Sequence, residues 1–386
     1  MAELTSEEIL AQLVSFDTTS RNSNLALIDW VEDYLANHGV ASERVYDDTG
    51  QKANLYATIG PSDVPGYILS GHTDVVPVDG QSWQTDPFKL EAADGRLYGR
   101  GTCDMKGFLA CCLAKVPDFV AAPLAKPIHL AFSYDEEVGC IGIQGLLNEL
   151  KERPVIPEAC FVGEPTNMQV VIAHKAKRSL RAFFTGKACH SSLSPQGVNA
   201  IDFAARFVVK LKEMADRLET GPIDALYDVP FTTAHTGTIE GGTILNIVPE
   251  HCVVSFEFRV LPNENADALV SEIMEFAKDT LEPEMKSRSE NSGIKFEWIS
   301  QFPGLNTAQD ADVTRLAKRL AGRNDHAKVA YGTEAGLFVD IADVPTVVVG
   351  PGSIEQAHKP DEFIVRSELE KCGAFLDRLI FHAGQP

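Results

Sequence analysis

The sequence predicts an α/β protein with a discontinuous catalytic domain, in which a central mixed sheet lies between helices, and an inserted α+β domain. Two observations predict this. Strand-like and helix-like segments alternate over the first part of the chain and again over the last part. Between them, strands with strong β alternation accompany two long helices. We therefore expect a catalytic domain at 1–178 and 289–386 and an inserted domain at 179–288.

The first part opens with two helical patterns. Thr5 and Glu8 have the spacing of a capping box, and apolar residues follow with helical period. A second pattern covers 27–35 and stops at Gly39, a typical left-handed closing residue. We then expect strands at 54–59, 67–70, 128–134 and 159–163, and helices at 106–119 and 141–151.

The middle and last parts continue with longer elements. In the middle we expect strands at 180–185, 232–239 and 252–260 and helices at 199–218 and 266–281. In the last part we expect strands at 295–299 and 346–349 and helices at 312–321 and 367–381. A chain of 386 residues exceeds what one hydrophobic core usually holds, so two or more domains fit its length.

Composition and charge exclude several classes of protein. Hydrophobic residues make up 44% and charged residues 23%, as in ordinary globular proteins. The net charge of −21 repels polyanions, so we expect no nucleic-acid partner. We see neither a membrane span nor a secretion signal, and eight Cys without a C-x-x-C pair fit a reducing compartment. We therefore expect a cytoplasmic protein.

His72 and Asp74 are the first candidate site residues. They follow the expected strand at 67–70, and ligands gather at the carboxyl ends of strands in α/β sheets. Residues two apart point to the same side of an extended chain, so the Asp74 carboxylate could orient the imidazole of His72 at a metal. The alternative is a surface loop with a capping Asp.

Asp104 is the second candidate. It lies in a Gly-rich segment, residues 98–107, directly before an expected helix. Its alternative role is the N-cap of that helix. The neighbouring Cys103 is more typical of a small buried hydrophobe than of a nucleophile.

Three consecutive acids, Asp135, Glu136 and Glu137, follow the expected strand at 128–134. Their mutual repulsion requires a cation, protons or full solvation to offset it. Glu136 and Glu137 project in different directions, so one can ligate a metal while the other handles protons. The alternative is a solvated loop.

Glu164 and His358 complete the set. Glu164 closes the expected strand at 159–163, or it is a turn residue before Pro165; His358 lies in a Gly-rich loop, where a lone His is usually structural. Taken together, two His and three carboxylates suit two divalent ions roughly 3.5 to 4 Å apart, with one carboxylate shared and one Glu left free. We expect zinc, with cobalt or manganese as alternatives.

Six segments, in this order along the chain, resemble the co-catalytic metallohydrolase family. They are SGHTDVVP (70–77), LYGRGTCDMKG (97–107), SYDEEVG (133–139), VGEPT (162–166), GKACHSS (186–192) and PGSIEQAHKPDEF (351–363). Each segment is weak alone, but the ordered set is specific and spans nearly the whole chain. The resemblance implies hydrolysis of a linear amide with two metal ions.

The resemblance also implies the metal ligands. His72 and Glu164 bind one metal, Glu137 and His358 bind the other, and Asp104 bridges the two. A cis peptide bond follows the bridging residue in this family, so we expect one between Asp104 and Met105.

Three residues receive catalytic roles by the same resemblance. Glu136 is the general base, and Asp74 orients His72. His190, in the inserted domain, reaches the site of the partner subunit and stabilises the tetrahedral oxyanion. The inserted domain is therefore expected to act as a lid and to join a homodimer.

Substrate contacts are implied for Asn246, Arg259 and Glu334. A guanidinium suits a free α-carboxylate, and Glu334 is a candidate by charge for an ammonium group. The segments at 332–335 and 350–363 most resemble the branch of the family that removes the acetyl group from N2-acetyl-L-ornithine. That reaction gives ornithine and acetate, within arginine biosynthesis.

Other functions stay open at this point. The same two-metal site serves other N-acyl amino acid deacylases, desuccinylases and dipeptidases. A non-catalytic small-molecule binder would retain the cleft without the chemistry. A thiol hydrolase built on Cys103 or Cys189 would survive chelation but not alkylation.

Overall fold

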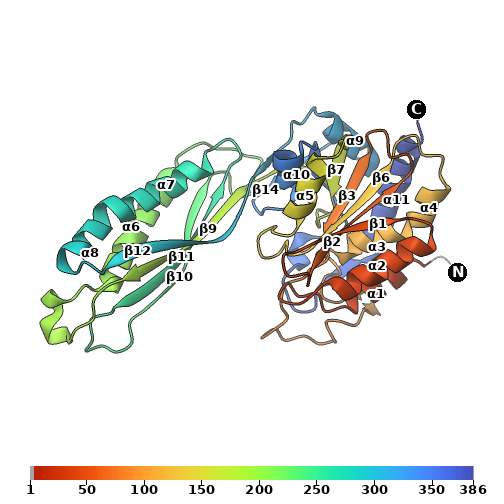
Figure 1. Cartoon of the computed structure of the whole chain (residues 1–386). Coiled ribbons are helices and arrows are strands. Elements are labelled where there is room, and N and C mark those ends of the chain that lie inside the picture. Colours follow the sequence, from red (N-terminus) through yellow and green to blue (C-terminus); the bar gives the residue numbers. More distant parts are fainter. Residues whose placement is uncertain (1–3, 386) are drawn as a thin grey trace. The chain divides into compact units, whose positions relative to one another are not determined.

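The computed structural model describes residues 4–385, which form two compact units (Figure 1). The first unit comprises residues 4–173, Leu305–Lys328 and residues 333–385, and the second comprises His174–Gly304 and Val329–Gly332. The predicted α/β class is confirmed. The second unit extends beyond residue 288, because the strand expected at 295–299 pairs with a strand of this unit instead of joining the first sheet.

Within residues 4–385, nine strands form the large sheet of the first unit. They are β1 (Ser42–Tyr46), β2 (Ala53–Ile59), β3 (Tyr67–His72), β6 (Ile128–Ser133), β7 (Ala159–Val162), β8 (Val171–His174), β13 (Leu305–Asn306), β14 (Ala327–Val329) and β15 (Thr346–Val348). Their order is β1-β2-β6-β3-β7-β15-β8-β13, with β14 beside β8. The neighbours β6, β3, β7 and β15 are parallel, so their carboxyl ends lie at one edge of the sheet.

Helices cover both faces of this sheet (Figure 1). They are α1 (Ser6–Val14), α2 (Leu25–Asn37), α3 (Lys106–Ala114), α4 (Val116–Ala121), α5 (Ile143–Lys151), α9 (Asp312–Ala321), α10 (Ala335–Ala342) and α11 (Arg366–Ala383). Helix α3 packs against β3, α1 and α11, whereas α5 packs against α10. The helix expected at 106–119 is two helices, because Pro117 in the first turn of α4 has no N–H to continue α3.

A small sheet of β4 (Glu91–Ala93), β5 (Arg96–Tyr98) and β16 (Phe363–Val365) completes the first unit. It joins two segments that are far apart in the sequence, since β16 pairs with β5. The 3-10 turn Ile354–Gln356 lies in the loop between β15 and β16.

The second unit is an α+β layer. Its sheet has the order β10-β11-β9-β12, with β9 (Ala176–Thr185), β10 (Thr233–Gly241), β11 (His251–Val260) and β12 (Gly293–Phe302). Its helical segments are the 3-10 helix Ser191–Gln196, α6 (Ala200–Glu219), α7 (Ala266–Phe276), the π-helical turn Ala277–Leu281 and α8 (Glu282–Arg288). Helix α6 packs across the sheet, and Asn199 caps its first turn.

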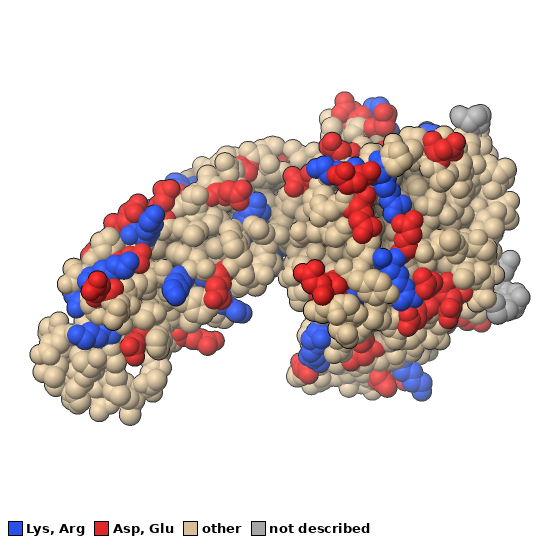
Figure 2. Space-filling model, in the orientation of Figure 1, with Lys and Arg blue, Asp and Glu red and all other residues tan. Residues whose placement is uncertain are grey.

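Charged side chains are scattered over the surfaces of both units (Figure 2). On the face drawn in Figure 2, clusters of Asp and Glu alternate with clusters of Lys and Arg. The helices within residues 4–385 are each too short or too polar to span a bilayer.

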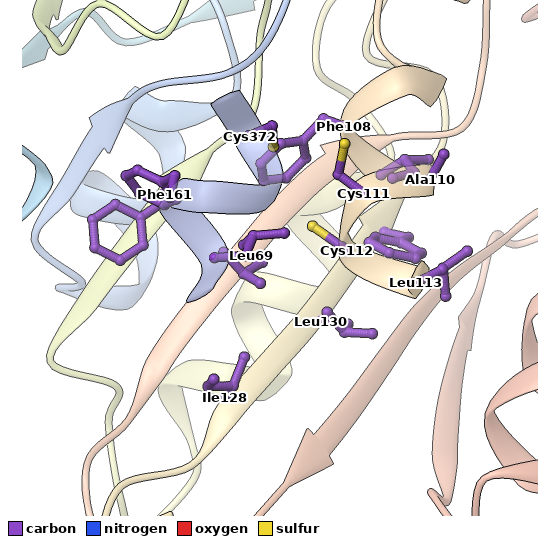
Figure 3. Packing of buried hydrophobic residues seen from close by; sticks show 14 of the residues in the cluster. Leu69, Phe108, Ala110, Cys111, Cys112, Leu113, Ile128, Leu130, Phe161 and Cys372 are labelled. Atoms are coloured by element: carbon purple, nitrogen blue, oxygen red, sulfur yellow. The ribbon is translucent and has the colours of Figure 1, made fainter. Parts of the chain in front are cut away.

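The core of the first unit lies between the sheet and the helices around α3. Figure 3 shows Leu69 of β3, Leu130 of β6 and Phe161 of β7 on the face that α3 covers. Cys111 and Cys372, from α3 and α11, fill the same layer. All eight cysteines are free, and seven of them are buried, so they act mainly as small hydrophobes here.

Candidate active site

Four side chains of the candidate site follow the parallel strands of the first unit. His72 is the last residue of β3, Glu137 follows β6, Glu164 follows β7, and His358 lies in the loop after β15. Because these strands are adjacent and parallel, their loops meet at one edge of the sheet.

Asp104 enters this edge by another route. As the sequence predicted, Asp104 lies in a Gly-rich segment before a helix, here the loop between β5 of the small sheet and α3. It is not a capping residue, because Met105 occupies the N-cap of α3 and makes no side-chain cap. The Asp104–Met105 peptide bond is cis, so that prediction is confirmed.

The Asp104 carboxylate lies between two histidines. Its Oδ1 is 3.1 Å from His72 Nε2, and its Oδ2 is 3.4 Å from His358 Nε2. Each histidine has a second acid beside it: Glu164 Oε1 is 3.9 Å from His72 Nε2, and Glu137 Oε2 is 3.0 Å from His358 Nε2. The geometry therefore forms two groups of donors on either side of Asp104.

Burial and mutual repulsion shape the charge of this cluster. Burial and the neighbouring Asp104 carboxylate together raise the pKa of Glu137 to about 7. Burial also raises the pKa of Glu164, with Asp104 adding to the effect. Burial alone would raise the pKa of Asp104 too, but the hydrogen bonds from His358 and His72 outweigh it and lower that pKa. Because the carboxylates of Asp104, Glu137 and Glu164 lie close together and repel one another, the cluster favours the binding of positive charge.

The donor set fits divalent cations. Donor atoms of His72, Asp104 and Glu137 lie within 4.8 Å of one another, and the same holds for His72, Glu136 and Glu164. Glu137 Oε1 is buried without a hydrogen-bond partner among the described residues, which fits a carboxylate oxygen that binds a cation. Imidazole and carboxylate donors suit zinc and its neighbours.

His72 is set up as a ligand by the main chain. Its Nδ1 lies 2.8 Å from the carbonyl oxygen of Asp74, which can only accept a hydrogen bond. The proton of a neutral imidazole then sits on Nδ1, and Nε2 keeps its lone pair toward Asp104 and Glu164.

The Asp74 carboxylate faces the His72 imidazole and has a further task besides the predicted one. Its Oδ1 is 3.6 Å from His72 Nδ1, farther than the carbonyl oxygen of the same residue. It accepts hydrogen bonds from the main-chain N–H groups of Glu136 (3.1 Å) and Glu137 (3.3 Å) and from the Ser20 hydroxyl (2.6 Å). Asp74 thus anchors the backbone that carries both glutamates.

Glu136 lies beside the cluster. Burial and the Glu137 and Asp104 carboxylates, opposed by His72, raise its pKa to about 8. The Cys140 thiol donates to its Oε1 over 3.2 Å. Asp135, the first of the three consecutive acids, turns away and pairs with Lys52 at 2.5 Å.

Glu334 is buried and already hydrogen-bonded within the first unit. Only 1% of the residue is exposed, and its two oxygens accept hydrogen bonds from Ser70 (2.6 Å) and Ser133 (2.8 Å). Burial raises its pKa. The carboxylate therefore ties the ends of β3 and β6 together inside the first unit, which argues against direct contact with substrate.

His190 and Asn246 are neighbours in the second unit. The Ser191 N–H donates to the Asn246 carbonyl over 2.9 Å, and His190 forms a bridge with Ile247. His190 Nδ1 accepts from the Ser192 N–H (3.2 Å), so a neutral ring carries its proton on the exposed side, at Nε2.

Arg259 lies far from these two residues along the same sheet. It pairs with Glu257 at 3.0 Å near the end of β11, while Asn246 precedes the start of that strand at His251. Eight residues of extended strand correspond to roughly 26 Å. One second unit therefore does not bring Arg259 and Asn246 to the same point.

Ser20, Glu362 and Arg100 were not singled out from the sequence. Ser20 supports Asp74, and Glu362 binds the main chain of the loop that carries Asp104. Glu362 belongs to the segment 351–363 that carried the family resemblance, so its acidic side chain within that motif was the available signal. Ser20 has no comparable signal.

Comparison with known proteins agrees with this geometry. The profile described as peptidase family M20/M25/M40 matches residues 68–382. The acetylornithine deacetylase of Pasteurella multocida is 33% identical over 367 residues, covering 95% of this chain and 93% of the relative. That of Myxococcus xanthus is 34% identical over 378 residues, covering 97% and 96%.

A solved structure has the same architecture. The M20 family metallo-carboxypeptidase Sso-CP2 from Sulfolobus solfataricus aligns with a TM-score of 0.78 over 97% of this chain and 98% of its own, at 18% identity. At that identity the likeness concerns the fold alone. The family match and the relatives lead to one conclusion: this chain belongs to peptidase family M20/M25/M40 and is a hydrolase of that family.

Proposed function

We propose that this chain is a two-metal amidohydrolase that removes the acetyl group from N2-acetyl-L-ornithine and releases L-ornithine and acetate. The observation that carries the two-metal part is the meeting of His72, Asp104, Glu137, Glu164 and His358 at one sheet edge. The substrate is supported by the relatives, which cover nearly the whole chain and are named acetylornithine deacetylases.

The metal positions follow the two groups of donors. His72 and Glu164 would hold one ion, Glu137 and His358 would hold the other, and Asp104 would bind both. When bound, divalent ions such as Zn²⁺, Co²⁺ or Mn²⁺ polarise an amide carbonyl and make water acidic enough to give hydroxide near neutral pH. Zn²⁺ is our first choice for this set of imidazole and carboxylate donors.

Glu136 is the proposed proton carrier. Its carboxylate accepts a proton from the attacking water and later delivers a proton to the leaving amine. Asp74 positions Glu136 through the main chain, because it accepts the Glu136 N–H. The thiol of Cys140 orients one oxygen of the same carboxylate.

The second unit supplies the remaining groups of the proposal. His190 would donate from Nε2 to the oxyanion, while Arg259 and Asn246 would bind polar groups of the substrate. Arg259 lies near the end of β11, whereas Asn246 precedes its start. A homodimer joined through the second unit therefore fits best, in which each site takes Arg259 from one subunit and His190 with Asn246 from the other.

Mixing two inactive variants tests the shared site. Glu136→Gln and His190→Ala should each be nearly inactive alone, and hybrids of the two should regain part of the turnover, since one of their two sites is intact. Activity is measured after co-refolding, with each variant refolded alone as control. Hybrids no more active than the parents would show that each site belongs to a single subunit.

A cytoplasmic location fits eight free cysteines, because thiols persist in a reducing compartment.

A thiol hydrolase is disfavoured at Cys103, whose thiol is buried, donates to the Ser353 carbonyl and has a raised pKa because of burial. Cys189 is only partly buried, and its thiol donates to the Leu193 carbonyl.

One panel separates acetylornithine from the alternatives. Protein reconstituted with Zn²⁺ or Co²⁺ is assayed with N2-acetyl-L-ornithine, other N-acetyl and N-succinyl amino acids, and dipeptides. We expect the highest kcat/KM for N2-acetyl-L-ornithine and loss of turnover with a chelator. A higher kcat/KM for a succinylated substrate or a dipeptide would replace the proposed substrate and leave the two-metal chemistry in place. Turnover that survives chelation would refute that chemistry.

A further inference from the structure

Glu362 is a buried carboxylate that binds the loop carrying Asp104. Only 1% of the residue is exposed. Its Oε1 accepts the main-chain N–H groups of Cys103 (2.8 Å) and Asp104 (3.1 Å). Its Oε2 accepts the Gly101 N–H (3.1 Å) and the Arg100 guanidinium (2.7 Å). Four donors thus converge on one carboxylate, and three of them belong to the backbone next to the bridging Asp.

Arg100 extends this support to the loop that carries His358. The guanidinium is also buried, with 1% of the residue exposed, and its Nη2 donates to Gln81 Oε1 over 2.6 Å. The Gln81 amide in turn donates to the His358 carbonyl over 3.1 Å. Arg100 Nη1 also reaches the Lys359 carbonyl, at 3.4 Å. One chain of hydrogen bonds therefore runs from the backbone of Asp104 to the backbone of His358.

The other two-donor group takes its support elsewhere. His72 is oriented by the Asp74 carbonyl, and Glu164 lies two residues after the end of β7, at the centre of the sheet. The chain of hydrogen bonds through Glu362, Arg100 and Gln81 thus touches Asp104 and His358 but neither His72 nor Glu164 among the described residues.

We propose that Glu362, Arg100 and Gln81 are positioning residues that set the cation affinity of the position formed by Glu137 and His358. His358 needs such support, because its side chain is 54% exposed and its backbone has a φ of 63° in a loop. Partners that fix a ligand in this way are typically worth 10- to 100-fold in metal affinity. The proposal rests on the two-metal function proposed above.

Glu362→Gln is the most direct test, because it keeps the shape of the side chain and replaces one of its two acceptor oxygens with an NH₂ donor. Whichever way the amide turns, its NH₂ group faces N–H donors that the carboxylate used to accept. Those buried donors lose their partner, and the backbone at Asp104 and His358 is free to shift. Glu368→Gln is the matched control: Glu368 is also buried (7% exposed) and accepts the Gly352 N–H at 3.2 Å, outside this chain of hydrogen bonds.

The experiment titrates the chelator-treated full-length protein with Co²⁺, followed by calorimetry and by visible absorption. Glu137→Gln first identifies which of two binding events belongs to the Glu137/His358 position, as the event that it removes. Glu362→Gln should weaken that event about 10- to 100-fold and weaken the other event less, because the other position shares only Asp104 with this chain of hydrogen bonds. Gln81→Ala, which removes the hydrogen bonds of the Gln81 side chain with Arg100, Trp83 and the His358 carbonyl, should weaken the same event about fivefold. Glu368→Gln should match the wild type.

Equal weakening of both events, weakening of the other event alone, or no change would overturn the proposal. Circular dichroism shows whether Glu362→Gln folds, and Gln81→Ala decides the question if it does not. Failure of the two-metal function is visible separately, since the wild-type protein would then show fewer than two Co²⁺ events before any variant is compared. Failure of the proposed substrate leaves these titrations unaffected.

Discussion

Glu136, the proposed proton carrier, is a buried carboxylate within the acidic cluster. Its carboxylate lies beside three other acids, and burial and these acids together raise its pKa to about 8. Its backbone is anchored by Asp74, and one oxygen is held by Cys140. A carboxylate in such a setting accepts a proton more readily than one in water.

Glu136→Gln should therefore separate chemistry from metal binding. The amide cannot accept the proton, so kcat should fall about 10²-fold or more, while both cations stay bound because the five proposed ligands are intact. Steady-state kinetics and metal analysis of the same sample check this. Asp135→Asn is the matched control, since Asp135 is the adjacent acid but pairs with Lys52, and it should keep wild-type kcat. If kcat of Glu136→Gln stays near wild type, the proton carrier is another residue.

Residue types predict ligands better than they predict supporting roles. His72, Asp104, Glu137, Glu164 and His358 belong to a short list of side chains that bind metals, and ordered motifs carry them. Asp74 was predicted to orient His72, but its hydrogen bonds to main-chain N–H groups were not predicted, because nearly every residue has such a group and no sequence motif marks it. Glu334 was judged by charge alone, and its actual partners, Ser70 and Ser133, lie on strands far from it in sequence.

At the scale of elements, the contact between β7 and α3 sets the place of Glu164. Gly163 follows β7, and a Cβ at this position would lie 2.1 Å from ring carbons of Phe108 in α3. The absence of a side chain therefore lets the helix pack directly on the strand end that leads to Glu164.

Gly163→Ala should push these two elements apart. We expect a loss of about 1–3 kcal/mol in the free energy of unfolding, together with weaker cation binding, because the shift reaches Glu164. Urea unfolding and Co²⁺ titration measure the two effects. Gly373→Ala in α11 is the control: nothing lies within 4 Å of the added Cβ, and a helical Ala should be neutral or stabilising by up to about 1 kcal/mol. Equal stability of the two variants would contradict the close packing at Gly163.

Long elements were predictable from periodicity, whereas most short ones were not; the short strands β7 and β15 are exceptions. The capping box at Thr5 and the helix over 199–218 appear as expected, as α1 and α6. The sequence analysis did not include α10, a short apolar helix, or the two- to five-residue strands β1, β4, β5, β8, β13, β14 and β16. Segments of this length lack enough repeats to show a period, and pairing partners distant in the chain decide their structure.

At the scale of the whole molecule, buried neutral histidines make stability depend on pH. His174 is fully buried in the second unit, and burial lowers its pKa to about 4 from an ordinary value of 6.5. The unfolded chain binds this proton more readily than the folded one, so the stabilising effect is present above pH 6.5 and is lost as pH falls toward 4.

His174→Leu should reduce this dependence. Between pH 7 and pH 5 the titration of one such histidine costs about 2 kcal/mol of folding free energy, and the variant should lose less stability than the wild type by about that amount. Urea unfolding at both pH values measures the difference for each protein, and metal is removed from both with chelator. An identical loss in the two proteins would mean that His174 does not titrate in this range.

The C-terminal boundary of the inserted unit was predicted too early, at residue 288. Residues 295–299 have the pattern of a strand, which the alternation of elements assigned to the first domain. In the structure, β12 pairs with β9 over its whole length. Only the identity of the partner strand decides the unit to which such a segment belongs, and that identity is a long-range property.

The order of the five proposed ligands along the chain has a consequence for biosynthesis. Four of them precede the second unit, and His358 follows it. A ribosome therefore translates the entire second unit before the last ligand is made, although early parts of a chain begin to fold as they emerge. Prematurely terminated products that stop anywhere in the second unit would fold in part and yet trap no complete metal pair, so catalysis begins only once translation has passed residue 358.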